Sequence, residues 1–535
     1  MAYNSTILVP VPKEKIAYKD PNKDGSKYVY YLTECYRDKK GNPTNRRKLI
    51  GKIDKKTGLL IPNKNYYQFF NDTEVKIIPN SIINYGGSYL VNHILKELKI
   101  DHYLVESFGE DLALKIMTIA TYMFVDSSIM FYLDEYCSSN FINTEKPVTS
   151  QSASQIFDKI DHDQTMSFYK KWVKHIAANE YIAYDVTSIS SYSCCQDDVE
   201  FGYNRDKEKL PQFNIGMYFG ETSGLPIFYT KYPGSILDKS HLKYMMEYNK
   251  ELGIKNVNFV MDKGFYTRNN IIYMKNNNLP FLICVSNKYL TSAKKIQNHL
   301  NSIEKYDNFI KKCDTYGVLD ETSSYGVKTN TFIYYDSNKA EIEKKNLYRK
   351  IEKYVFELSQ IKVLTKTQAR FYNRYLDINY NQEDKTFTFK KNGNKIDELA
   401  KKQGFFILIS TLKNKDISYA IKTYRRKDCV EKTFDNLKNS MDMKRLHIHK
   451  DSTTDGKLFV SFISLIIKTY VENKLQDYLL ENNSSIEKII RELQKIKLVT
   501  LNKKTIMAPL TAKQKKILLP FDMNEDTIIN SLKYK

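Results

Sequence analysis

Five side chains within residues 424–438 are spaced so that they could share one face of a helix. They lie alternately three and four positions apart: Tyr424, Lys427, Glu431, Phe434 and Lys438. At 3.6 residues per turn this spacing aligns them in one stripe. The stripe places a carboxylate between an aromatic ring and two ammonium groups, which suits a metal-dependent site acting on a phosphate backbone. A charged surface helix stabilised by ion pairs explains the same pattern.

Two aspartates stand in or directly after predicted strands. Residues 181–190 alternate as a strand does, and Asp185 falls inside it. A buried carboxylate without a partner is costly, so Asp185 requires a metal ion or a hydrogen bond from a neighbouring strand. Asp262 follows the apolar run 257–261, and α/β sheets carry their sites at the carboxyl ends of such strands. A turn aspartate before a glycine is the simpler interpretation of Asp262.

Composition indicates a soluble protein with a polyanionic partner. The chain has 83 Lys and Arg against 62 Asp and Glu, for a net charge of +21, which favours nucleic acid first and an anionic membrane surface second. Seven scattered cysteines without a C-x2-C pair predict neither disulfides nor a zinc ribbon. The apolar windows 116–125 and 458–467 are too short to span a bilayer, so no membrane association is expected.

The amino-terminal region carries a second basic segment. Residues 27–62 alternate aromatic and β-branched stretches with turn residues, which predicts a small β meander. Arg46, Arg47 and Lys48 lie in its second strand. They could contact DNA, or they could form a charged edge that resists aggregation. The sequence favours neither interpretation.

The three acidic motifs together resemble those of DDE transposases from bacterial insertion sequences. The stripe is similar to the family signature Y-x2-R-x3-E-x6-K, which Tyr424, Glu431 and Lys438 match. Lys427 stands where the family has arginine, which keeps the charge and loses a planar two-pronged interaction with phosphate. Asp185 lies in a D-x-T/S setting and Asp262 in a D-x-G-[FY] setting, which are the family's settings for the first and second acids.

The resemblance implies an α/β fold with a ribonuclease H-like mixed-sheet core split by an insertion. An insertion is expected because the interval between Asp262 and Glu431 is too long for a direct connection. Alternating segments such as residues 331–335 and 386–390 indicate that it is mainly β, with a helical part. Six segments are predicted: an amino-terminal β meander (1–80), a helical module that could bind DNA ends (81–180), the first core part (181–287), the inserted subdomain (288–403), the second core part with the Glu helix (404–475) and a basic helical tail (476–535).

The resemblance also implies a function. Asp185, Asp262 and Glu431 would be catalytic and would hold two Mg²⁺ ions, for which Mn²⁺ could substitute. The enzyme would cleave DNA at the ends of its element and transfer the strands to target DNA. The implied partner is double-stranded DNA, bound by a homodimer in a bacterial cytoplasm at the nucleoid. The residues expected to contact DNA are Tyr424, Lys427, Lys438, Arg425 and Arg205.

Two other functions fit the same residues. A metal-dependent nuclease on this fold would cut DNA and would not join it. A non-catalytic DNA-binding derivative would be expected to lack one of the acids, and all three are present.

Overall fold

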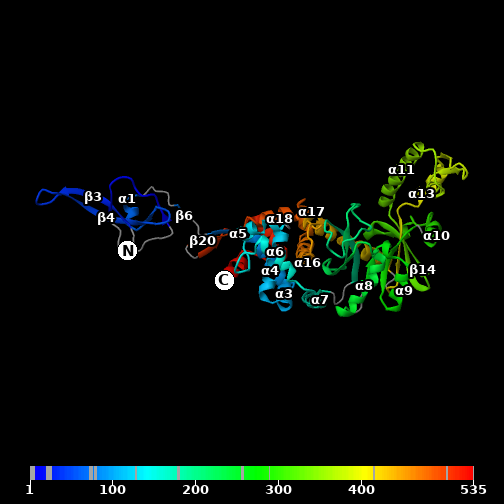
Figure 1. Cartoon of the computed structure of the whole chain (residues 1–535), viewed down its shortest axis with the longest axis horizontal. Coiled ribbons are helices and arrows are strands. Elements are labelled where there is room, and N and C mark those ends of the chain that lie inside the picture. Colours follow the sequence, from blue (N-terminus) through cyan, green and yellow to red (C-terminus); the bar gives the residue numbers. More distant parts are fainter. Residues whose placement is uncertain are drawn as a thin grey trace. The chain divides into compact units, whose positions relative to one another are not determined.

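The chain folds into two compact units, each assembled from segments far apart in the sequence. One unit comprises Met1–His93, Glu135–Asn143 and Lys474–Lys535, and the other comprises Ile94–Asp134 and Thr144–Asn473. The computed structural model in Figure 1 describes residues 7–19, 27–70, 76–77, 81–126, 129–176, 181–254, 258–287, 289–413, 416–501 and 504–533.

A large mixed sheet is the centre of the second unit. Its strands follow the order β10-β9-β8-β11-β12-β18-β15-β14-β13, and β19 pairs with β8. β8 pairs antiparallel with β9 and parallel with β11, and β11 continues parallel to β12. The strands are β8 (Tyr181–Ser191), β9 (Gln212–Gly220), β10 (Pro226–Pro233), β11 (Asn258–Met261), β12 (Phe281–Val285), β13 (Phe309–Ile310), β14 (Thr315–Ser324), β15 (Val327–Tyr335), β18 (Phe405–Ser410) and β19 (Arg445–Leu446).

Helices cover both faces of this sheet. Successive residues of a strand point to opposite faces, and two neighbouring residues of β11 contact the two sets of helices. Val260 packs in the cluster that includes Ile421 of α14. The preceding Phe259 packs against Tyr218, whose hydroxyl donates to the backbone oxygen of Met245 in α8. The helices near the sheet are α8 (Asp238–Glu251), α9 (Arg268–Asn276), α10 (Leu290–His299), α14 (Ile417–Arg426) and α15 (Asp428–Asp435).

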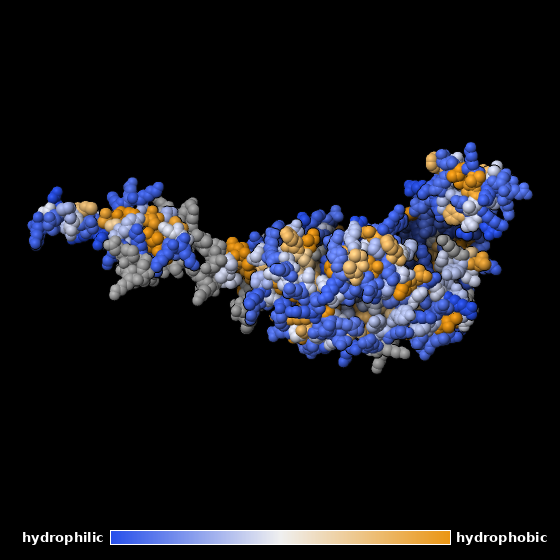
Figure 2. Space-filling model, in the orientation of Figure 1, coloured by the Kyte–Doolittle hydropathy of each residue, from blue (hydrophilic) through white to orange (hydrophobic). Residues whose placement is uncertain are grey.

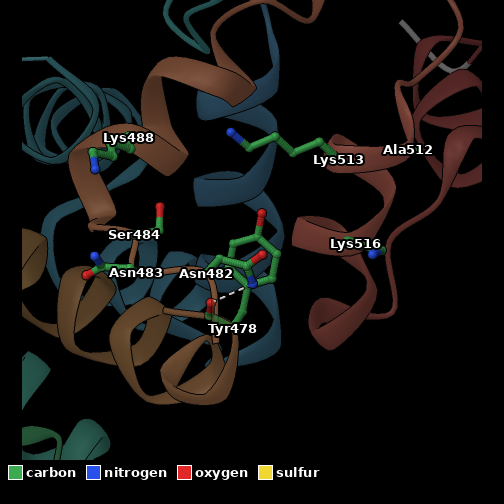
Figure 3. A pocket seen from close by; sticks show the side chains of 8 residues that line it. All are labelled: Tyr478, Asn482, Asn483, Ser484, Lys488, Ala512, Lys513 and Lys516. Atoms are coloured by element: carbon green, nitrogen blue, oxygen red, sulfur yellow. Dashed lines mark hydrogen bonds between the residues drawn. The ribbon is translucent and has the colours of Figure 1, made fainter. Parts of the chain in front are cut away.

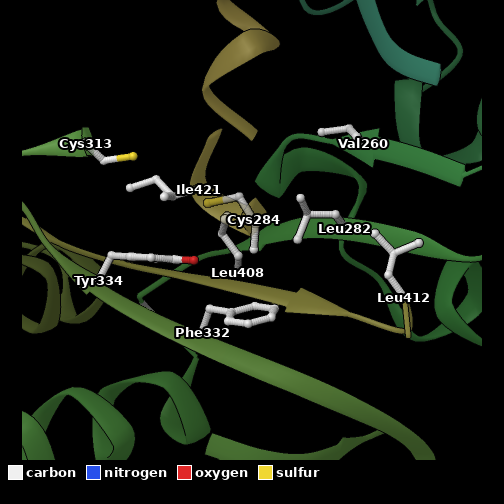
Figure 4. Close-up of a cluster of buried hydrophobic side chains, with 10 residues drawn as sticks. Val260, Leu282, Cys284, Cys313, Phe332, Tyr334, Leu408, Leu412 and Ile421 are labelled. Atoms are coloured by element: carbon white, nitrogen blue, oxygen red, sulfur yellow. The ribbon is translucent and has the colours of Figure 1, made fainter. Parts of the chain in front are cut away.

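The apolar cluster in Figure 4 joins the sheet to α14. It contains Leu282 and Cys284 from β12, Leu408 from β18 and Tyr334 from β15, and all of them are buried. The ring of Tyr424, at the carboxyl end of α14, packs against the same cluster. The core of the sheet therefore fixes the helix that carries the first residue of the predicted stripe.

A buried helix bundle completes this unit. Phe459 of α16 is fully buried and packs against the rings of Phe108, Phe168 and Tyr169. The sole tryptophan, Trp172, is buried, and its indole donates to the backbone oxygen of Pro226 at 3.0 Å. The bundle consists of α3 (Ile100–Phe108), α4 (Glu110–Val125), α6 (Ser150–Asp158), α7 (His162–Ile176) and α16 (Asp451–Lys474).

The predicted insertion contributes to two different structures. Strands β13, β14 and β15 extend the main sheet, because β15 pairs with β18. The remainder has its own core around Leu347, Ile351 and Leu376. It consists of α11 (Ser337–Ser359), α12 (Lys366–Tyr372), β16 (Asp377–Tyr380), β17 (Phe387–Lys390) and α13 (Gly393–Lys401). This separate part is thus mostly helical, whereas the insertion was expected to be mainly β.

The described part of the first unit contains three small antiparallel sheets. Their orders are β2-β3-β4-β5, β21-β20-β7 and β1-β6. Val29, Ile50 and Tyr66 form the core under the first sheet. The elements are β1 (Ile7–Leu8), β2 (Ile16–Lys19), β3 (Tyr28–Arg37), β4 (Pro43–Ile53), β5 (Leu60–Pro62), α1 (Tyr66–Phe69), β6 (Lys76–Ile77), β7 (Ser81–Asn84), α2 (Gly86–Glu97), α5 (Leu133–Ser139), α17 (Gln476–Glu481), α18 (Ile486–Leu493), β20 (Lys497–Leu501), β21 (Lys504–Met507), α19 (Ala512–Leu518) and α20 (Glu525–Lys533).

Within the described residues no single helix has the length and apolar character needed to cross a membrane. Glu110–Val125 and Met130–Ser139 meet that test only when they are joined across a 109° bend.

Candidate functional site

Asp185 and Asp262 come together because their strands are neighbours. β8 and β11 run parallel, and their register pairs Tyr184 with Met261. Asp185 directly follows Tyr184, and Asp262 directly follows Met261. The two aspartates therefore lie at the same level of the sheet, where adjacent strands are about 4.8 Å apart. The structure thus brings together the two aspartates that the sequence singles out.

Lys427 supplies a positive charge to these acids. Its Nζ lies 3.0 Å from Oδ2 of Asp185, and the two side chains are only 7% and 17% exposed. Burial alone would lower the pKa of Lys427, but the charges of Asp185, Asp262 and Glu431 outweigh it and raise that pKa above its usual value. The other oxygen of Asp185 accepts the backbone N–H of Val186 at 2.9 Å. The buried ammonium of Lys427 therefore interacts electrostatically with all three predicted catalytic acids.

Tyr424 holds the second aspartate. Its hydroxyl donates to Oδ1 of Asp262 at 3.1 Å. Burial, together with the neighbouring Cys284 and Asp262, raises the pKa of this phenol far above its usual range, so the hydroxyl keeps its proton and remains a donor. The ring packs on the core of the sheet. In this structure Tyr424 therefore fixes the orientation of an acid.

Replacing Tyr424 by phenylalanine is expected to destabilise the folded protein only slightly. The ring would keep its packing, and the absence of the hydrogen bond to Asp262 would reduce the free energy of unfolding by about 0.5–1.5 kcal/mol. Urea unfolding of Tyr424→Phe measures this change. Tyr419→Phe is a matched control, since Tyr419 lies five positions earlier in α14 and packs against Tyr181. A loss well above this range in Tyr424→Phe alone would show that the hydroxyl has a larger role.

Glu431 lies on α15 and is exposed. The single continuous helix expected over residues 424–438 is interrupted. α14 ends at Arg426, α15 begins at Asp428, and a π-helical turn, η5, spans Asn436–Ser440. A π-helical turn inserts an extra residue into the repeat, which shifts every later side chain around the helix. The charge of Glu431 contributes to the raised pKa of Lys427, while the Glu431 side chain is exposed to solvent.

The remaining residues that were expected to contact DNA have partners inside the protein. Nζ of Lys438 lies 2.7 Å from Oδ2 of Asp206, and Arg205 pairs with Asp238. Arg425 donates to the backbone oxygen of Cys313, to Thr315 and to Asp336. Lys427 and Lys438 are also buried. In this structure these side chains join elements of the unit to one another, and their interaction with DNA stays a prediction.

Sequence reasoning missed the acidic partners of these cations. Asp206 and Asp238 hold Lys438 and Arg205, and Glu221, which is 3% exposed, holds Arg426 at 2.9 Å. No spacing rule connects residues more than 200 positions apart, as Arg426 and Glu221 are. The one local signal was Asp206, which directly follows Arg205 in a polar loop.

The donor chemistry of the three acids fits a hard divalent cation, which prefers carboxylate oxygens. Their positions are not those of a formed metal site, because no group of three or more His, Cys, Asp and Glu side chains that could hold a metal ion occurs in the described residues. In this arrangement the Lys427 ammonium provides the neutralising charge. A metal ion at these acids would require Lys427 to move away from Asp185.

A basic cavity elsewhere contains none of the predicted site residues. It has a volume of about 440 Å³, belongs to the first unit and is lined by Lys488, Lys513 and Lys516 with neutral neighbours (Figure 3). Asn482 closes one side and donates to the backbone oxygen of Tyr478 at 2.9 Å. It has no carboxylate in its lining, so it cannot supply the acids of a hydrolytic site.

Comparisons with known proteins agree in part with the sequence analysis. A family described as "Transposase DDE domain" matches residues 178–467, just over half of the chain. No curated protein matches. Among solved structures, the cryo-EM structure of a piggyBac transposase synaptic complex with hairpin DNA aligns over 70% of this chain and 78% of its own, with 10% sequence identity and a TM-score of 0.33.

Proposed function

The chain belongs to the transposase DDE domain family, and from this membership we propose that it cleaves DNA at the ends of an insertion sequence and transfers the cut strands to target DNA. The proposed catalytic groups are Asp185, Asp262 and Glu431. One observation carries the proposal: Nζ of the buried Lys427 lies 3.0 Å from Asp185, and the charges of Asp262 and Glu431 also act on this ammonium. Acids from two adjacent strands and one helix are thus gathered around a single charge.

We propose a ribonuclease H-like core for the sheet that holds these acids. The central position of β8, between the antiparallel β9 and the parallel β11, supports this fold, since β8 carries the first acid. The return of the chain through β18, after the long excursion from β12, supports an insertion in the core. α14 and α15 then deliver the third acid.

The proposed cofactor is Mg²⁺, as two ions, with Mn²⁺ as a substitute. When bound at the three acids it would supply Lewis acidity and a nucleophilic hydroxyl at neutral pH. The residues of the chain would prepare the site in other ways. Asp185 and Asp262 are held at one level by strand register, Tyr424 orients Asp262, and Glu431 can approach from α15 because its side chain is exposed.

The basic residues near the acids would exchange their internal partners for DNA phosphates. Lys427 and Lys438 each hold one carboxylate now, and a phosphate oxygen can replace a carboxylate in a charge-assisted hydrogen bond of this kind. Arg205 could exchange Asp238 in the same way. Arg425 donates to three internal acceptors, so it would contribute mainly by holding α14 in place.

The proposed partner is double-stranded DNA, both at the element ends and at the target. The net charge of +21 supports a polyanionic partner. A homodimer on DNA is proposed because two ends must be cut and joined together. The proposed location is the nucleoid in a bacterial cytoplasm, without a membrane partner.

Metal removal tests the reaction directly. The full-length protein would be incubated with a labelled duplex carrying the end of its own element and an unlabelled target duplex, in Mg²⁺, in Mn²⁺ or in EDTA. Nicked and joined products are expected with either metal ion, and neither product is expected in EDTA, because the three acids alone cannot activate the attacking water.

The products also separate the alternatives. Nicked DNA without a joined product would favour a metal-dependent nuclease. Binding of the duplex without any product would favour a non-catalytic DNA-binding protein. Equal cleavage in EDTA and in Mg²⁺ would contradict the proposed use of metal.

A further inference from the structure

The hairpin of β3 and β4 extends beyond the core beneath it. β2 pairs with β3 only from Tyr28 to Tyr31, and β5 pairs with β4 only from Gly51 to Ile53. From Thr33 outward, most residues of both strands are exposed on both faces. This distal part, residues 33–48, is called the ribbon below. An isolated pair of strands is only marginally stable in water, so an exposed ribbon of this length suggests a partner that covers it.

The ribbon has a defined register and two basic faces. β3 pairs with β4 through Glu34 with Arg46 and Cys35 with Asn45, after a bulge between Leu32 and Glu34. Side chains of paired residues share a face and alternate along the strand. One face therefore carries Arg46 and Lys48, and the opposite face carries Arg37 and Arg47. Both faces can present cations to a partner that surrounds the ribbon.

The ribbon is strongly positive. Residues 33–48 contain six Lys and Arg and two Asp and Glu, for a net charge of +4. Both acids have local roles: Glu34 pairs with Arg46 at 3.1 Å, and Asp38 accepts backbone N–H groups of its own turn, which lowers its pKa. Among the described residues, Arg46 is the one cation of the ribbon with a carboxylate partner. Five cations without such a partner remain for another molecule: Arg37, Lys39, Lys40, Arg47 and Lys48.

Aromatic rings hold the basic side chains in place. The guanidinium of Arg47 lies 5.1 Å from the ring of Tyr30, and that of Arg46 lies 5.5 Å from Tyr36. The ammonium of Lys48 lies 5.8 Å from the ring of Phe69. The face of an aromatic ring attracts a cation electrostatically, which restricts these side chains. The hairpin tip is coloured as hydrophilic in Figure 2.

We propose that the ribbon enters the major groove of duplex DNA and provides a binding surface separate from the three acids. The major groove, about 12 Å wide and 8.5 Å deep, admits a two-stranded β-ribbon. Phosphates on both sides of the groove then face the cations on the two faces of the ribbon. The tip, which carries Lys39 and Lys40, would reach the base edges or the far strand. This inference rests on the proposed function only in taking DNA as the partner.

DNA fits the ribbon better than the other polyanionic or apolar surfaces do. A membrane surface is flat and would meet one face, whereas the cations occupy both faces. A protein that adds a strand would use the backbone of an edge and would not require the charge. The exposed side chains of the distal ribbon include one large aromatic, Tyr36, which is 42% exposed, so the ribbon lacks an apolar patch for either partner.

The test neutralises three of these five cations, two at the tip and one on a face of the ribbon, in the full-length protein. Binding of a fluorescent duplex of mixed sequence by Lys39→Gln/Lys40→Gln/Arg47→Gln would be measured by anisotropy over a range of salt concentrations. We expect a dissociation constant about tenfold higher at physiological ionic strength. We also expect the slope of log Kobs against log salt to decrease by about one for each phosphate that the variant no longer neutralises.

A triple variant of a different basic segment provides the control. Lys345→Gln/Arg349→Gln/Lys353→Gln removes the same charge from exposed positions of α11 and is expected to bind DNA as the wild type does. An equal loss in both triple variants would show that only net charge matters. An unchanged affinity and slope in the ribbon variant would overturn the proposal.

A footprint tests the groove. Dimethyl sulfate methylates guanine N7, which faces the major groove, so the wild type should protect guanines that the ribbon variant leaves reactive. Unchanged protection in the variant would also contradict the proposal. A variant that loses binding to anionic vesicles while its DNA binding is unchanged would identify a membrane surface instead. Cleavage at saturating DNA reports on the proposed function independently, since the ribbon contains none of the three acids.

Discussion

Strand cleavage by Glu431→Gln is expected to fall by about 10³-fold or more, while the affinity for DNA stays unchanged. The carboxylate on α15 is the third acid near Lys427, and glutamine keeps its size while removing the negative charge. A metal ion contributes several kcal/mol to catalysis, and each 1.4 kcal/mol corresponds to a factor of about ten in rate. Cleavage of a labelled element end and anisotropy of the same duplex measure the two quantities.

The neighbouring acid on the same helix provides the control. Asp435 lies one turn after Glu431, is exposed, and accepts a hydrogen bond from Asn439, so Asp435→Asn should cleave DNA at a rate close to that of the wild type. If Asp435→Asn loses cleavage and Glu431→Gln does not, the third acid is Asp435. If both variants remain active, neither position supplies it and the triad is wrong.

The exposure of Glu431 gives this experiment its value. Asp185 and Asp262 are fixed by the register of adjacent strands, whereas Glu431 depends on α15, which is set off from α14 at Lys427. Its side chain faces solvent. Of the three acids it is therefore the one whose role cannot be inferred from packing.

The sequence was sufficient to place Asp185 in a strand and Asp262 directly after one, because each strand is a short alternating or apolar run with clear ends. Their proximity needed one further fact, the order of strands in the sheet. β8 and β11 are neighbours although β9 and β10 lie between them in the chain. A local pattern contains no information on which strands pair, so the resemblance to a family provided what the spacing could not.

The partners of the basic residues could not be predicted in this way. Lys427 and Asp185 are 242 positions apart, and Lys438 and Asp206 are 232 apart. Their pairing depends on how α15 and η5 pack over β8 and the loop after it. The charge pattern of residues 424–438 indicated a surface for phosphate, and the fold uses two of its lysines as buried counter-ions. Sequence reasoning found the residues and missed their present partners.

The described inserted region shows a similar limit. The alternating stretch around residues 331–335 was correctly expected to be β, and it lies in β15. It was assigned to the inserted subdomain because it lies in the long polar interval between Asp262 and Glu431. Its pairing with β18 places it in the main sheet. Alternation identifies a strand, but the partner of that strand decides which domain it joins.

Lys427→Met is expected to destabilise the metal-free protein and to strengthen its binding of Mg²⁺. Methionine fills a similar volume without the ammonium that neutralises Asp185 at 3.0 Å. Breaking a buried ion pair costs about 3–5 kcal/mol, and because Asp185 is partly exposed we expect about 1–3 kcal/mol here. The same carboxylates, without their internal cation, should bind a divalent ion more tightly. Thermal unfolding in EDTA and in increasing Mg²⁺ measures both effects without any DNA.

The size of the Mg²⁺ effect distinguishes a counter-ion from an ordinary buried lysine. Each tenfold gain in affinity adds about 1.4 kcal/mol of stability at saturating ligand, so Lys427→Met should gain more from Mg²⁺ than the wild type does. Lys432→Met removes an exposed charge from α15, five positions after Lys427, and should change neither quantity. If Lys427→Met is destabilised and Mg²⁺ stabilises it no more than the wild type, Lys427 is a packing residue, and the ammonium and the metal ion do not compete for the three acids.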